Sequence, residues 1–194
     1  MSFWGTQLGE GQRDPKRKFR FKVTIGGLEG GIIWYLKTTG KPEMTISGDT
    51  THKFMGHSFH FPGSVSWNEI EMTLVDPVDE NKKDAAGKLL KIIEAAGYVY
   101  PDDKYIDEAT PKGLKTISKA KAVSALNSVV ISQLDADGET VEEWTLHNPF
   151  ITKVGFGDLS YDSEDLSEIS ISFKYDWATF NAEDRERPFQ NRST

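Results

Sequence analysis

Residues 167–177 read SEISISFKYDW, and this stretch decides the fold. Large apolar residues alternate in it with polar ones; they are Ile169, Ile171, Phe173, Tyr175 and Trp177. Alternation with a period of two is typical of a β-strand that is buried on one face. A one-residue slip in pairing would turn all of these side chains to water, at a cost of about 1.5–3 kcal/mol for each fully buried one. The pattern therefore predicts one strand with a single acceptable register.

Shorter runs of similar composition predict further strands. These predicted strands are residues 19–25, 32–37, 44–46, 57–61, 65–75, 127–134 and 139–147. The turn residues Pro62, Gly63 and Ser64 predict that 57–61 pairs with 65–75, and Asp135–Gly138 predicts a hairpin between the last two strands. Within 65–75 the apolar phase shifts, which predicts a bulge near Asn68 and Glu69.

One helix is expected over about residues 79–96. Leu89, Ile92, Ile93 and Ala96 follow helical spacing, with Asp79 as a candidate N-cap and Gly97 as a C-terminal stop. The polar segment 98–124 contains two prolines and is expected to be a long loop or insertion with little regular structure. Residues 47–55 are polar until Phe54 and are expected to project as a loop.

These elements predict a mainly β protein, an antiparallel β barrel or sandwich of two packed sheets with one flanking α-helix. The predicted domain spans residues 19–180. Residues 1–18 and 181–194 are charged and are expected to be N-terminal and C-terminal arms.

Composition excludes several classes of function. The net charge of −7 argues against a tight nucleic-acid clamp, because such binding depends on Lys and Arg. The chain has 0 Cys, so it has no disulfide and no thiolate chemistry. No apolar run approaches the roughly 20 residues that span a bilayer, and no secretory signal is evident, so we expect an unprocessed chain without a membrane partner.

The polar residues predict no catalytic, metal or cofactor site. His57 and His60 are three apart in a predicted strand and point to opposite faces, which does not suit a shared metal. Asp135 and Asp137 resemble the start of a calcium loop, but a hairpin turn explains them. The many carboxylates are not spaced as a general acid and base pair, so we expect no enzyme and no cofactor.

Several segments in order resemble the tail tube protein of contractile-tailed bacteriophages. The segments are FRFKVTI, FHFPGSVSWNEIEMTLVDP, DENKKDAAGKLLKIIEAAG and NPFITKVGFGDLSYDSEDLSEISISFKYDWATF, between Lys18 and Phe180. Residues 98–124 and the C-terminal arm depart from the family pattern.

The resemblance implies a structural subunit of the virion tail, assembled in the host cytoplasm. Hexameric rings of this protein would stack into a tube that passes DNA through its lumen without specific binding. Its partners would be other copies of itself, the tail sheath protein, and baseplate and tail terminator proteins. Phe3, Trp4, Phe54 and Met55 are the candidate contacts between subunits, because they have little local surface to bury against.

Two alternatives remain open at the level of sequence. One is the inner tube of a type VI secretion or extracellular contractile injection system, which would pass protein. The other is a ligand-binding β barrel, which would be a monomer or dimer with an occupied pocket.

Overall fold

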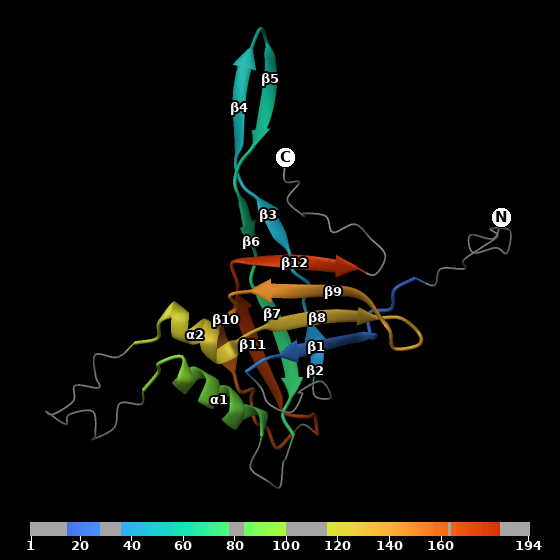
Figure 1. The fold of residues 1–194 in the computed structure, drawn as a ribbon, viewed down its shortest axis with the longest axis vertical. Coiled ribbons are helices and arrows are strands. Elements are labelled where there is room, and N and C mark those ends of the chain that lie inside the picture. The colour runs from blue at the N-terminus through green and yellow to red at the C-terminus, as the bar shows by residue number, and fades with distance from the viewer. Residues whose placement is uncertain (1–14, 28–35, 78–83, 100–115, 163, 183–194) are drawn as a thin grey trace, which may run out of the picture.

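The protein, a computed structural model, is described over residues 15–27, 36–77, 84–99, 116–162 and 164–182. Two four-stranded antiparallel sheets lie across each other in Figure 1. The first has the order β1-β8-β9-β12, formed by Phe21–Ile25, Val129–Leu134, Thr140–His147 and Trp177–Ala182. The second has the order β10-β11-β7-β2, formed by Phe150–Gly155, Glu168–Lys174, Ile70–Val75 and Leu36–Thr39. Within the described residues they form a sandwich and do not close into a barrel.

The core lies where the buried faces of the two sheets meet. In the second sheet Ile171 of β11 sits between Met72 of β7 and Val154 of β10, and both Ile171 and Met72 are fully buried. In the first sheet Ile131 of β8 lies opposite Val23 of β1. The alternation of the closing run is confirmed for Ile169, Ile171, Phe173 and Tyr175, all of which are buried.

The expectation for Trp177 is wrong. The closing run is two strands, because β11 ends at Lys174 and β12 begins at Trp177 in the other sheet. Trp177 is 45% exposed and its ring stacks on His147 with centroids 4.9 Å apart. The chain turns from one sheet to the other at Asp176. The alternation of apolar and polar residues continues through this corner, but Trp177, beyond it, no longer faces the core.

The described residues contain two helices beside the sandwich, where one was predicted. The first, α1, spans Ala85–Ala95 and is capped by Asp84, whose side chain accepts a hydrogen bond from the Gly87 amide. It therefore starts later than predicted, and Asp79 lies outside the described residues. Gly97 follows α1 with a φ of +113°, as expected of a C-terminal stop.

The second helix, α2, spans Lys119–Leu126 and begins inside the segment 98–124, which was predicted to have little regular structure. It packs against α1 and β10, burying Ala122 and Leu126. Its N-cap is Ser118, whose hydroxyl accepts from the Lys121 amide. The apolar periodicity that usually marks a helix is weak here, since only these two residues of α2 are buried.

The predicted pairing around Pro62–Ser64 is also wrong. The strand β5 (His57–Pro62) pairs with β4 (Asp49–Phe54), whereas β6 (Val65–Trp67) pairs with β3 (Met44–Ile46). Asn68 and Glu69 separate β6 from β7, which lie in different sheets, so the predicted bulge is a break between two strands. Most of the predicted strand 32–37, Phe3, Trp4 and most of both terminal arms lie outside the described residues.

Candidate assembly surface

A two-stranded arm projects from the sandwich along the longest axis of the molecule (Figure 1). Its base is the β3–β6 ladder and its outer part is the β4–β5 hairpin. Every residue of β3 and of β5 is exposed. The arm carries these large exposed apolar side chains: Met44, Ile46, Phe54, Met55, Phe59, Phe61 and Val65. Among the described residues of a single copy, nothing covers this apolar surface.

The tip of the arm is a two-residue turn between Phe54 and His57. Met55 has a φ of +47° and Gly56 a φ of +80°, the pattern of a type I′ hairpin turn. Asn or Gly is usual at the first of these positions, because a side chain without local hydrogen bonding pays about 1–2 kcal/mol in the left-handed region. Met55 has a strained backbone and is 84% exposed, so neither its conformation nor burial of its side chain stabilises the folded chain.

The structure places Phe54 and Met55 together at the tip, and their role as subunit contacts stays a prediction. The sequence reading missed Phe59 and Phe61, 50% and 54% exposed, because alternate aromatics in a strand normally indicate a buried face. No local signal distinguishes a core-facing strand from a strand of this kind.

A second exposed surface lies at the other end of the sandwich, in residues 156–167. Phe156, Leu159, Tyr161 and Leu166 are exposed there, Leu159 and Tyr161 almost completely. The same segment has four carboxylates and no Lys, Arg or His; the carboxylates are Asp158, Asp162, Glu164 and Asp165. The surface is thus apolar and acidic together.

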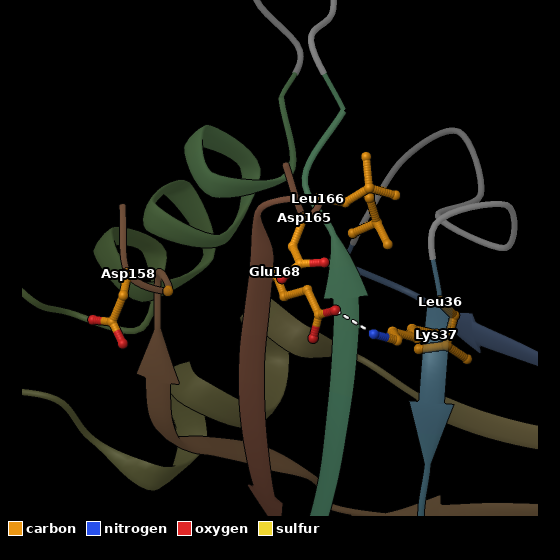
Figure 2. A pocket seen from close by; sticks show the side chains of 8 residues that line it. Leu36, Lys37, Asp158, Asp165, Leu166 and Glu168 are labelled. Carbon is orange, nitrogen blue, oxygen red and sulfur yellow. Dashed lines mark hydrogen bonds and ion pairs between the residues drawn. The ribbon is translucent and has the colours of Figure 1, made fainter. Parts of the chain in front are cut away.

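Next to this segment is an open groove of about 720 Å³ at the ends of β2, β7 and β11 (Figure 2). Leu36, Val75 and Leu166 supply its apolar lining. Across it Lys37 forms an ion pair with Glu168, and this hydrogen bond, together with the nearby Asp165, raises the pKa of Lys37. Figure 2 shows Asp165 beside Glu168, with Asp158 set apart from them. The lining residues come from distant parts of the sequence, which is why no motif marks the groove.

Glu142 of β9 is the center of a buried polar cluster. It is 8% exposed and forms ion pairs with Lys16 and Lys41, while the Trp144 indole donates to it at 2.7 Å. Burial would raise the pKa of this carboxyl, but the three donors outweigh burial and lower the pKa of Glu142 to about 2. The cluster ties the chain before β1 and the chain after β2 to β9.

An ion pair between Lys119 and Asp176 fixes the corner between the sheets. Asp176 accepts hydrogen bonds from Lys119 of α2, at 2.6 Å, and from the side-chain Nδ2 of Asn148, at 2.8 Å. These bonds, the one from Lys119 foremost, lower the pKa of Asp176. The corner that separates β11 from β12 is therefore held to the helix layer.

The described residues hold no group of three or more His, Asp or Glu side chains placed to bind a metal. His52 and His57 lie on the arm opposite Phe59 and Phe54, and His147 hydrogen bonds Thr179 at 2.9 Å. Asp135 accepts the amides of Asp137 and Glu139, each at 2.9 Å, which confirms a hairpin turn at the sequence resembling a calcium loop. None of the described helices is long and apolar enough to cross a membrane.

Known proteins resemble this chain in fold but not closely in sequence. No protein-family model matches it, and no curated protein matches it. A chain from the sheath-tube complex of an extracellular contractile injection system, PVC, aligns with a TM-score of 0.60 and 15% identity over 87% of this chain and 92% of that chain. A chain from the PVC sheath/tube terminator aligns with a TM-score of 0.60 and 16% identity over 88% and 99%.

A third similar structure is a chain of the anti-feeding prophage baseplate, with a TM-score of 0.56 and 12% identity over 89% of this chain and 99% of that chain. At these identities the comparisons establish the fold. The chain has the sandwich fold of subunits found in contractile injection systems, and the alignments cover nearly the whole of each subunit.

Proposed function

We propose that this chain is a structural subunit of the tube of a contractile tail, built from stacked hexameric rings and enclosed by a sheath. The observation that carries the proposal is the projecting arm, whose apolar side chains are exposed on a sandwich that already has a complete core. An exposed apolar arm lowers the solubility of an isolated chain. Its presence is explained if neighbouring copies cover it in an assembly.

The strand edges support the same role. In the two four-stranded sheets of the described residues, β1, β12, β10 and β2 are the edge strands and each pairs on one side only. Unpaired edges of this kind join neighbours in an assembly. Subunits that meet through two different surfaces form rings where the rotation closes and filaments where it does not, and a tube of stacked rings uses both.

In the tail of a bacteriophage the tube would pass DNA, with the sheath, baseplate and terminator proteins as partners. The role is mechanical and needs no catalytic group or cofactor. The net charge of −7 suits it, because an acidic lumen would not hold phosphate. The second candidate is the inner tube of an extracellular contractile injection device, which is favoured by the likeness to the PVC and anti-feeding prophage chains.

The proposal is tested by electron microscopy and sedimentation of the purified chain across a range of concentrations. We expect six-fold rings or tubes. A species that stays monomeric at high concentration would reject the tube role, and a monomer that also binds a small ligand would support a ligand-binding sandwich. Electron microscopy of particles from the producing cells, followed by analysis of their contents, separates a DNA-filled tail from a protein-loaded device.

A further inference from the structure

The methionines are the only sulfur-bearing residues of the chain, which has 0 Cys and 4 Met. The structure describes three of them, and these three differ widely in exposure. Met72 of β7 is fully buried in the core, and Met44 of β3 is 43% exposed. Met55, in the turn between β4 and β5, is 84% exposed. An oxidant that attacks thioethers therefore reaches Met55 first among the described methionines, because its attack requires access to the sulfur.

Met55 stands at the end of an aromatic surface. The antiparallel register of β4 and β5 places three aromatic side chains on one face of the arm, and they are Phe54, Phe59 and Phe61. Each of the three is at least 50% exposed. Met55 follows Phe54 directly in the turn, so the arm ends in apolar groups. An assembly that covers the arm removes these groups from water.

Oxidation of Met55 would make the end of the arm polar. A peroxide transfers one oxygen atom to the thioether sulfur of methionine. The sulfur lone pair forms the new S–O bond, the O–O bond breaks, and hydrogen peroxide leaves as water. The sulfur is oxidised by two electrons and the peroxide is reduced by two. The product, methionine sulfoxide, is polar, so a contact that buries it without a hydrogen bond loses its hydration.

We propose that Met55 is an oxidation site that controls self-assembly of the chain, with a peroxide as the oxidant. The inference rests on the proposed function, in which neighbouring copies cover the arm, and it names a modification that prevents this. In a free subunit the thioether is open to peroxide. In a tube the neighbours that cover the arm also keep peroxide away from it, so oxidation acts on subunits that have not yet assembled. Methionine sulfoxide reductases return such subunits to the assembling form.

Mild oxidation of the wild-type chain by hydrogen peroxide tests the proposal without any substitution. The treated chain is allowed to assemble and is sedimented, and mass spectrometry measures the sulfoxide at each methionine in pellet and supernatant. We expect Met55 to be oxidised faster than Met44 and Met72. Its sulfoxide should be enriched about tenfold or more in the supernatant, since the oxidised side chain no longer gains from burial. Treatment with reductases for both sulfoxide epimers should return this material to the pellet.

Two variants locate the effect within the arm. Met55→Leu removes the sulfur at the tip, and Met44→Leu is the matched control at the base. Each chain is compared with itself before and after peroxide, and thermal unfolding shows that the sandwich is intact. Peroxide should raise the concentration needed for assembly by about tenfold or more for the wild type and Met44→Leu, and should not change it for Met55→Leu.

Three results would each overturn the proposal. They are oxidation of Met44 or Met72 ahead of Met55, equal Met55 sulfoxide in pellet and supernatant, and a Met55→Leu variant as sensitive to peroxide as the wild type. In all three cases tubes of the untreated wild type still uphold the proposed function. An untreated wild-type chain that never assembles rejects both the oxidation site and the proposed function.

Discussion

The buried carboxylate of Glu142 holds two distant segments of the chain together. It forms ion pairs with Lys16, which precedes β1, and with Lys41, which follows β2. Its pKa of about 2 lies below the ordinary value of 4.5, so its ion pairs stabilise the folded chain fully above about pH 4.5. As pH falls from 4.5 toward 2 the folded carboxylate is protonated and this stability is lost. Because Lys16 and Lys41 are half exposed, we expect a contribution on the order of 2 kcal/mol.

We therefore expect Glu142→Gln to lower the free energy of unfolding at pH 7 by about 1–3 kcal/mol, and to flatten its dependence on pH below 4.5. Urea unfolding at several pH values measures both effects. Glu143→Gln, the same change at the next residue of β9, is the control. A pH profile of Glu142→Gln that parallels the wild type would show that other carboxyls govern acid unfolding.

Phe173 and Trp177 belong to one sequence pattern but have different surroundings. Phe173 is fully buried between the sheets, so Phe173→Ala should destabilise the chain by about 3–5 kcal/mol. Trp177 is 45% exposed, so Trp177→Ala should cost about 1 kcal/mol, mainly the stacking on His147. Thermal or denaturant unfolding compares the two, and equal losses would contradict the placement of Trp177 at an exposed corner.

At the scale of elements, one substitution in the turn of the β4–β5 hairpin can stabilise the hairpin and weaken assembly at the same time. Met55→Asn relieves the cost of a positive φ and should stabilise the hairpin, slowing amide hydrogen exchange in β4 and β5 by about two- to fivefold. The same change removes an apolar side chain from the tip and should weaken assembly. If assembly is unchanged, Met55 is not a subunit contact.

Gly56→Ala is the reverse control for this hairpin. Its φ of +80° makes a side chain there strained, although no atom lies within 4 Å of the added carbon. Hydrogen exchange in the hairpin should accelerate while Phe54 and Met55 remain at the tip. Comparing the two variants separates the effect of hairpin stability on assembly from the effect of the apolar tip.

The existence of most strands could be predicted from the sequence, but their grouping into sheets could not. Alternation identified the buried face of β11 because burial on one face is a local property of a strand. The corner at Asp176 and the break at Asn68 are set by contacts with Lys119, Asn148 and Thr45, which are distant in the sequence. Similarly, the sequence predicted that residues 47–55, with Phe54 and Met55 at their end, project from the domain, whereas the groove appears only when β2, β7 and β11 are brought together.

At the scale of the whole molecule, the arm is separable from the sandwich. Ser47 and Ser64 are joined by a hydrogen bond from the Ser47 amide to the Ser64 carbonyl at 2.8 Å, just beyond the ladder of β3 and β6. Gly48 follows Ser47 and Gly63 precedes Ser64, and Gly48 already has a φ of +74°. Deleting residues 49–62 would leave Gly48 and Gly63 as a two-residue turn, and a Gly-Gly pair is suited to such a turn.

We expect the chain lacking residues 49–62 to keep its cooperative thermal unfolding, because no residue of β4 or β5 belongs to the hydrophobic core. It should remain unassembled at concentrations where the full chain forms rings or tubes, since the tip and most of the exposed apolar side chains of the arm are gone. Circular dichroism during heating tests the first expectation and sedimentation tests the second. Loss of the unfolding transition would show that the arm supports the sandwich, and normal assembly would show that the remaining surfaces are sufficient to join the subunits.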